Sequence, residues 1–130
     1  MPPAVPLNPV DYLVIGHLAC DLTPDGPVLG GTVSYSALTA RALGLRVGIV
    51  SAGGDDISLA PLDGIQLVRA AGGRSTTFEN VYTPQGRIQY VHHIAPDLRP
   101  EHVPDIWKRA PIVHIGPIAP EIRACLVEAI

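Results

Sequence analysis

Short runs of apolar residues alternate with polar stretches along this chain. Residues 12–16 (YLVIG), 46–50 (RVGIV) and 112–115 (IVHI) are nearly continuous apolar runs of four or five residues. Strands that are buried on both faces, as in a parallel sheet, have this pattern. The sequence therefore predicts three strands of one parallel sheet.

The segment between the first two strands predicts a loop followed by a helix. Residues 19–31 are dense in Asp, Pro and Gly, which is typical of a loop with at least one tight turn. Residues 33–43 place Tyr35, Leu38 and Ala42 on one helical face, with Thr32 as the predicted N-cap and a glycine at the end. Strand, helix and strand form a β-α-β unit, whose two strands should be parallel.

The middle of the chain has a different pattern. Residues 65–69, 76–83 and 87–93 read as strands, and residues 84–86 (PQG) form a turn between the last two. Polar and apolar residues alternate in part, as expected of an antiparallel sheet with one open face. Such a sheet can cover a ligand.

The last third predicts short helices around one further strand. Pro104 limits residues 100–110 to one or two helical turns, with Trp107 packed onto the sheet. Ile122, Leu126 and Ile130 share the face of a helix that we expect to reach the last residue. A parallel sheet of three or four strands needs cover on both faces, so we expect the chain to be an incomplete fold.

Composition and charge narrow the function classes. The chain is 47% apolar and 16% charged, which is typical of a globular domain. Its net charge is −3 and it has a single lysine, so it lacks the basic stripe of proteins that bind nucleic acids or membranes. Residues 1–9 do not resemble a signal peptide, and Cys20 and Cys125 have no disulfide or metal spacing. We predict a soluble cytoplasmic protein.

Asp21, Gly30 and Gly31 are the candidate binding residues. Ligands of open α/β sheets bind beyond the carboxyl ends of the strands, and we expect Asp21 at the end of the first strand. A carboxylate accepts hydrogen bonds from two vicinal hydroxyls, and a diglycine before a helix exposes backbone N–H groups. On these residues alone, a turn-capping aspartate and an ordinary glycine turn stay open as alternatives.

Two linked motifs carry a resemblance to a known family. Residues 16–21 (GHLACD) resemble the first-strand G-x-x-x-x-D of ribokinase-like (PfkB) carbohydrate kinases, and residues 30–44 (GGTVSYSALTARALG) resemble the first signature of that family. The strand at residues 46–56 and the strand-turn-strand segment at residues 75–93 continue the likeness over most of the chain. The resemblance implies a truncated, Rossmann-like three-layer α/β fold with a small antiparallel β lid at about residues 65–93.

The resemblance also implies roles for individual residues. Asp21 would bind sugar or nucleoside hydroxyls, and Gly30 and Gly31 would bring backbone N–H groups to the same substrate. Tyr35 stands where the signature usually has Asn, so it would replace a polar substrate contact with a phenol. Residues 53–64 are shorter than the usual strand-helix connection, so we expect a helix to be missing there.

The enzyme that the resemblance implies is an ATP- and Mg²⁺-dependent phosphotransferase acting on an alcohol group. The sequence lacks the second signature of the family, Asp-Thr-x-Gly-Ala-Gly-Asp, which carries the catalytic base, and it lacks a P-loop. We therefore interpret residues 1–130 as the N-terminal substrate-binding part without the ATP-binding part, assign no catalytic residue, and expect the chain alone to be inactive. Lid strands in the family often pair between subunits, which favours a homodimer.

Other interpretations stay open beside the kinase. The main alternative is a non-catalytic module that binds a sugar or nucleoside, while a dinucleotide-binding domain is disfavoured because G-x-G-x-x-G is missing. His92 and His93 are adjacent on a predicted strand and so point to opposite faces, and His114 lies in an apolar strand. We predict no metal site.

Overall fold

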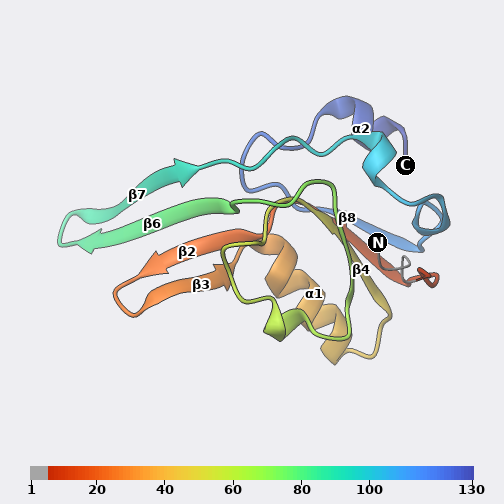
Figure 1. Ribbon diagram of the computed structural model, residues 1–130, viewed down its shortest axis with the longest axis horizontal. Coiled ribbons are helices and arrows are strands. Elements are labelled where there is room, and N and C mark those ends of the chain that lie inside the picture. Colours follow the sequence, from red (N-terminus) through yellow and green to blue (C-terminus); the bar gives the residue numbers. More distant parts are fainter. Residues whose placement is uncertain (1–5) are drawn as a thin grey trace.

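The central sheet has four parallel strands. The computed structural model describes residues 6–130, so the first five residues of the segment that we compared with a signal peptide lie outside the described residues. The strand order is β5-β4-β1-β8 (Figure 1). These strands are β1 (Tyr12–Ile15), β4 (Val47–Ser51), β5 (Gln66–Arg69) and β8 (Ile112–Ile115). The parallel strands predicted at residues 12–16, 46–50 and 112–115 are confirmed.

Helix α1 (Thr32–Ala42) packs on one face of this sheet. Val33 and Ala37 of the helix are buried with Val14 of β1 and Ile49 of β4, which confirms the predicted β-α-β unit. The prediction that Thr32 caps the helix is wrong. The N-cap is Gly31, whose φ of 92° favours glycine, and no side chain caps the helix.

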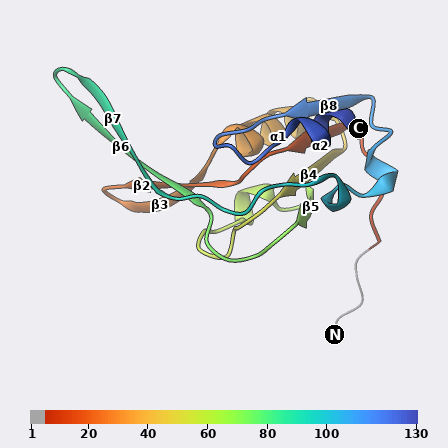
Figure 2. The ribbon, with the colours of Figure 1, turned by 90° about the horizontal axis from the view of Figure 1, so that it is seen from above.

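The second sheet, which we call the lid sheet, is built from two hairpins. Its strand order is β3-β2-β6-β7, and both hairpins extend away from the central sheet (Figure 2). A parallel ladder joins the two hairpins where residues 19–22 pair with residues 76–79. The strands are β2 (Ala19–Thr23), β3 (Gly26–Gly30), β6 (Thr76–Thr83) and β7 (Gly86–His93).

The loop predicted at residues 19–31 is wrong, because most of this segment forms the β2-β3 hairpin. Its turn, residues 23–26 (TPDG), repeats the pattern of the β6-β7 turn, residues 83–86 (TPQG). In each turn the threonine hydroxyl donates to the glycine carbonyl, at 2.7 Å and 2.8 Å, and the glycine has positive φ. The Asp, Pro and Gly residues of this segment thus belong to a hairpin and its tight turn.

The assignment of residues 65–69 to the antiparallel lid is also wrong. Strand β5 pairs in parallel with β4 and forms an edge of the central sheet. Its side chains pack in both directions, since Leu67 contacts the cluster beneath α1 and Val68 contacts the cluster on the other face. Before β5, residues 53–64 contain only the 3₁₀ turn η1 (Ala60–Leu62), in agreement with the expected missing helix.

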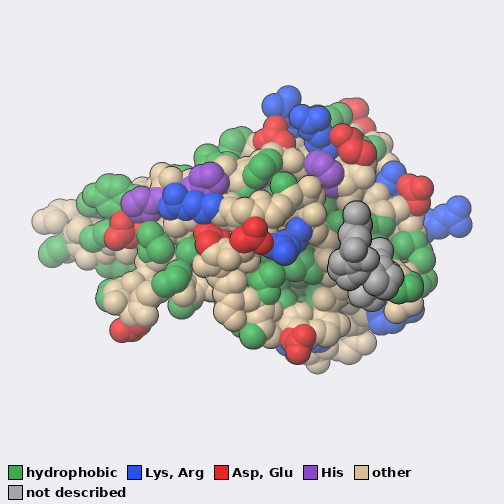
Figure 3. Space-filling view, in the orientation of Figure 1, with side chains coloured by type: hydrophobic (Ala, Val, Ile, Leu, Met, Phe, Trp, Pro, Cys, Tyr) green, Lys and Arg blue, Asp and Glu red, His purple; other side chains and the backbone are tan. Residues whose placement is uncertain are grey.

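The lid sheet is largely exposed and carries apolar side chains. On the face shown in Figure 3, hydrophobic side chains gather over the two hairpins, and histidine side chains lie along the second one. Every residue of β7 except His93 is exposed. Phe78 of β6 is the one large hydrophobic residue of the lid strands that is buried. The lid therefore depends on its backbone ladders and on its attachment to the body more than on a core of its own. The exposed large hydrophobic residues of the lid are Val28, Val81, Tyr82, Ile88, Tyr90 and Val91.

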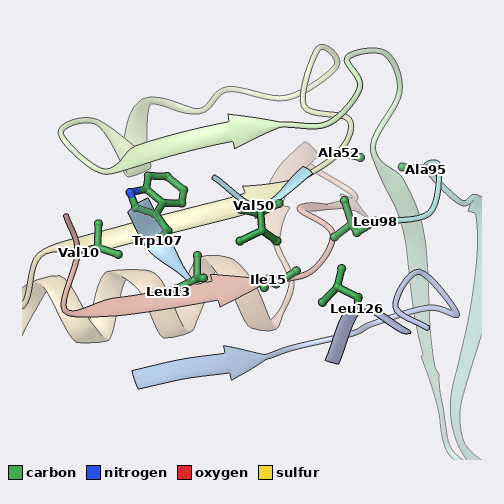
Figure 4. Close-up of a cluster of buried hydrophobic side chains, with 10 residues drawn as sticks. Val10, Leu13, Ile15, Val50, Ala52, Ala95, Leu98, Trp107 and Leu126 are labelled. Atoms are coloured by element: carbon green, nitrogen blue, oxygen red, sulfur yellow. The ribbon is translucent and has the colours of Figure 1, made fainter. Parts of the chain in front are cut away.

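Trp107 is the largest fully buried side chain of the core on the face opposite α1, and it lies at one end of this core near Val10 (Figure 4). It is fully buried, as predicted, and its Nε1 donates to the Asn8 carbonyl at 2.9 Å. A Cβ on Gly48 would lie 3.1 Å from the indole, so the glycine lets the ring approach the sheet closely. The helical segments on this face of the central sheet are η2 (Pro100–His102), η3 (Asp105–Trp107) and α2 (Ala124–Glu128).

The helical segments of this layer are short. The turns predicted at residues 100–110 are confirmed as two 3₁₀ turns, but the last helix spans five residues and does not reach residue 130 as predicted. Among residues 6–130, neither helix is long and apolar enough to cross a bilayer.

Candidate functional site

Asp21 and Gly30 lie side by side on the first lid hairpin. Strand β1 ends at Ile15, so Asp21 is not at the end of the first strand as predicted; it lies in β2, opposite Val28 of β3. A Cβ on Gly30 would collide with the Asp21 carboxylate, whose Cγ it would approach to 2.8 Å. The glycine thus leaves room for the carboxylate beside the start of α1, which Gly31 caps.

The Asp21 carboxylate is partly withdrawn from water. Burial raises the pKa of Asp21 above its ordinary value of 3.8, because desolvation disfavours the charged form. Among the described residues, no lysine or arginine forms an ion pair with it. Its oxygens are therefore available as hydrogen-bond acceptors for a ligand.

A groove of about 640 Å³ lies between the two lid hairpins. We call it the lid groove; residues 21–24 and 28 line it from the first hairpin and residues 79–82 from the second. The hairpins are paired only up to Leu22 and Glu79, and the groove lies where they separate. Its volume falls in the range of small-molecule sites.

Tyr35 does not line the lid groove. Its side chain is 62% exposed and lies along a separate groove of about 430 Å³ that α1 shares with Tyr12 and Ile112. The structure thus brings Gly30 against the Asp21 carboxylate, while neither Gly30, Gly31 nor Tyr35 lines the lid groove with Asp21. Tyr35 lies one turn inside the helix, where its backbone N–H donates to the Gly31 carbonyl.

Sequence analysis missed a buried polar cluster at the root of the lid. His17 is fully buried; its Nδ1 lies 2.7 Å from the Thr76 hydroxyl and its Nε2 lies 2.7 Å from the Pro96 carbonyl oxygen. The Thr76 hydroxyl also accepts from the Ala95 N–H at 3.0 Å. One side chain therefore joins the end of β1 to the segments that enter and leave the second lid hairpin.

Glu121 completes this cluster, which we call the root cluster (His17, Thr76, Glu121). Its Oε2 lies 3.1 Å from His17 Nδ1, and both side chains are fully buried. Its Oε1 accepts from the N–H groups of Ile118 and Ala119 at 2.8 Å and 2.9 Å. The available signal was a histidine inside an otherwise apolar run, GHLAC, although nothing in the sequence identified Glu121 as its partner.

Comparison with solved structures identifies the architecture. A pyrophosphate-dependent kinase in the ribokinase family, complexed with a pyrophosphate analogue and myo-inositol, matches 90% of this chain with a TM-score of 0.70 and 21% sequence identity. The fold is ribokinase-like. This confirms the resemblance and the truncated α/β fold that the sequence predicted.

Two further structures share the ribokinase-like fold. One is a sulfate complex of a pyrophosphate-dependent kinase in the ribokinase family (TM-score 0.61, 22% identity, 82% of this chain and 41% of that one). The other is a pyrophosphate-dependent myo-inositol-1 kinase converted into a myo-inositol-3 kinase by two substitutions (TM-score 0.60, 20% identity, 82% and 38%). This chain spans less than half the length of these proteins, including 44% of the first. No protein-family model matches the sequence, and no curated protein matches it.

The described part of this ribokinase-like fold shows no cluster of side chains that would hold Mg²⁺. Residues 6–130 contain no group of three or more His, Cys, Asp or Glu side chains that could hold a metal ion. The two acidic residues after β4, Asp55 and Asp56, form hydrogen bonds within the protein. Asp55 accepts from Arg69 and the Gly73 N–H, and Asp56 accepts from the Ser75 N–H. We therefore derive no chemical step that involves a donor or a metal on this part of the chain.

Proposed function

We propose that this chain is the acceptor-binding part of a ribokinase-like kinase that phosphorylates a hydroxyl group of a sugar or related polyol. The observation that supports the proposal most is the position of the Asp21 carboxylate. It is partly desolvated, has no cationic partner among the described residues, and lies against Gly30 at the start of α1. A carboxylate in this position binds uncharged ligands that donate hydrogen bonds.

Positioning of the acceptor is the contribution that these residues can make. Phosphoryl transfer depends on the alignment of the attacking hydroxyl and on electrostatic stabilisation of the transferred group. Asp21 would orient the hydroxyls, and the backbone at Gly30 and Gly31 would let the ring approach the helix. The catalytic base and the groups that stabilise the transferred phosphoryl would have to come from polypeptide outside residues 6–130.

The similar structures support a choice of acceptor and donor to test. One of them binds myo-inositol, another acts on it, and all three are pyrophosphate-dependent kinases. A cyclic polyol is therefore the first acceptor to test, with ribose and nucleosides next. The donor is a phosphoanhydride, either the ATP with Mg²⁺ that we predicted or inorganic pyrophosphate.

The second candidate is a non-catalytic module that binds a sugar or nucleoside. It rests on the same observation as the first candidate, the partly desolvated Asp21 carboxylate that lines the lid groove. In both candidates the same groove binds the same class of ligand, and they differ only in turnover. The cytoplasmic location and a homodimer through the lid strands stay predictions.

Ligand binding by Asp21 variants tests the proposal. Isothermal titration of the 130-residue chain with myo-inositol and with ribose should give saturable binding to at least one of them, and Asp21→Ala should weaken that binding at least tenfold. Asp25→Ala is the matched control, because Asp25 lies in the exposed turn of the same hairpin. Binding that is equal in wild type and Asp21→Ala would show that Asp21 does not bind the acceptor.

Turnover separates the two candidates. An assay for phosphorylated product should detect no reaction with the 130-residue chain, with either ATP and Mg²⁺ or pyrophosphate as donor, because the chain lacks a candidate base. Clear turnover would contradict our expectation that the chain alone is inactive and would remove the non-catalytic module as a candidate.

A further inference from the structure

The root cluster joins the body to residues 94–96, which lead the chain out of the second lid hairpin after β7. We call residues 94–96 the return segment. The Ala95 N–H donates to the Thr76 hydroxyl at 3.0 Å, and the Pro96 carbonyl oxygen lies 2.7 Å from His17 Nε2. Ala95 is buried, although every residue of β7 except His93 is exposed. The cluster is therefore a point at which the return segment is attached to the end of β1.

The hydrogen bonds of the root cluster require one ionisable proton. A carbonyl oxygen only accepts, so His17 Nε2 carries a hydrogen toward Pro96. On the other side of the ring, Nδ1 lies 2.7 Å from the Thr76 hydroxyl oxygen and 3.1 Å from Glu121 Oε2. A neutral ring beside an ionised carboxylate would place the Nδ1 lone pair against a carboxylate oxygen. A proton between these two atoms, on either one, converts the repulsion into a hydrogen bond.

The ring of His17 is the part of the cluster that can move when this proton is lost. Both side chains are fully buried, so water cannot solvate the carboxylate or separate it from the ring. Glu121 is fixed in place, because its two oxygens accept from the backbone N–H groups of His17, Ile118 and Ala119. A movement of the ring away from Glu121 breaks its contacts with Thr76 and Pro96, which are the contacts that hold the return segment.

Glu121 is the titratable side chain that forms bonds with His17 within residues 6–130. The other titratable groups on the surrounding segments have no hydrogen bond or ion pair with His17 among the described residues. Asp97 pairs with Arg123 at 3.0 Å, and Asp56 accepts from the Ser75 N–H at 3.0 Å. These other groups are Cys20, Asp21, Asp56, Arg74, Asp97 and Arg123.

We propose that the root cluster is a proton-dependent clamp. It holds the return segment against the body while one proton lies between His17 and Glu121, and it releases the segment when that proton is lost as the pH rises. The inference does not depend on the proposed function, because it concerns the chain without a ligand. Residues 79–82 of the same hairpin line the lid groove, so release of the clamp would change the width of the groove.

Amide hydrogen exchange of the 130-residue chain, without ligand, tests the clamp. The Ala95 N–H is the reporter, since its acceptor is the Thr76 hydroxyl, and the Val14 N–H in the central sheet is the internal reference. Protection factors correct for the effect of pH on intrinsic exchange. They are measured by NMR between about pH 5 and about pH 9, a range that spans the ordinary titration of histidine. The ratio of the Ala95 to the Val14 protection factor should fall at least tenfold as the pH rises.

Two variants and one spectroscopic signal identify the group responsible. His17→Gln removes the titrating ring, so its protection ratio should stay constant within twofold over the same range. His92→Gln is the matched control, because His92 lies 3.0 Å from a carboxylate, Glu79, on the exposed part of the same hairpin. This control should keep the wild-type pH profile. In wild type, the NMR signals of the His17 ring should change over the same pH interval as the protection ratio.

Three outcomes would overturn the inference. The first is a protection ratio that stays constant within twofold in wild type. The second is a loss of protection that does not coincide with the change in the His17 ring signals. Because this comparison uses wild type alone, it decides the matter even if His17→Gln does not fold. The third is the disappearance of the pH dependence in His92→Gln, which would assign the effect to the exposed pair.

Discussion

Glu121→Gln should lower the stability of the chain by about 2–3 kcal/mol at neutral pH. In the wild type, Glu121 Oε1 accepts two backbone N–H groups, while Oε2 accepts the His17 N–H at 3.2 Å and lies 3.1 Å from His17 Nδ1. A glutamine keeps the first oxygen and replaces the second with an NH₂ group. One hydrogen bond to a charged acceptor, about 1.5–3 kcal/mol, is lost, and a donor then faces a donor.

Glu121→Ala should have a larger effect than Glu121→Gln. Removal of one partner of a fully buried pair costs about 3–5 kcal/mol, and the alanine also leaves the Ile118 and Ala119 N–H groups without their acceptor. Domains of this size have a free energy of unfolding of about 5–15 kcal/mol, so this loss would take a large part of it. We expect partial unfolding of this variant at 37 °C.

Urea denaturation followed by circular dichroism measures both effects. With a slope of about 1–3 kcal/mol per molar urea, the midpoint of Glu121→Gln should fall by about 0.7–3 M. Glu128→Gln is the matched control, since Glu128 is exposed on α2, and it should stay within about 0.5 kcal/mol of wild type. A midpoint for Glu121→Gln equal to that of the control would refute the role of the root cluster in stability.

Two further predictions concern Asp21 and its neighbour. Because burial raises the pKa of Asp21 in the folded state, its charged form destabilises the fold above that pKa, and Asp21→Asn should be more stable than wild type at pH 7. In chemical denaturation this advantage should disappear as the pH falls below 3.8, and an advantage that grows in acid would contradict the sign. Gly30→Ala should displace the carboxylate and weaken polyol binding at least tenfold while the thermal midpoint changes little, so retained affinity would contradict the predicted displacement.

The central sheet could be predicted from the sequence because burial on both faces leaves a continuous apolar run. The strands at residues 12–15, 47–51 and 112–115 all have this pattern. Strand β5 has a less continuous apolar run. Because β5 directly precedes the lid segments in the sequence, it was wrongly assigned to the lid sheet. Pairing partners of strands are set by tertiary contacts, which local pattern does not report.

The candidate site was predictable in part. Asp21 and the diglycine carry recognisable chemistry, and the structure brings Gly30 against the Asp21 carboxylate. The first lid hairpin was missed because its composition is that of a loop, although its TPDG turn matches the TPQG turn that was recognised. His17 and Glu121 are 104 residues apart, and no local pattern connects a pair at that separation.

The fork between the two hairpins makes the tips of the lid well suited to carry spectroscopic labels. Beyond Leu22 and Glu79 no ladder joins the hairpins, so the turns at residues 23–26 and 83–86 are free of each other and far from the packed layers around the central sheet. Energy transfer between fluorophores attached at these two turns would measure the distance between the hairpin tips. The separation between them would report how the groove adjusts when a ligand enters, without any change to the residues that hold the protein together.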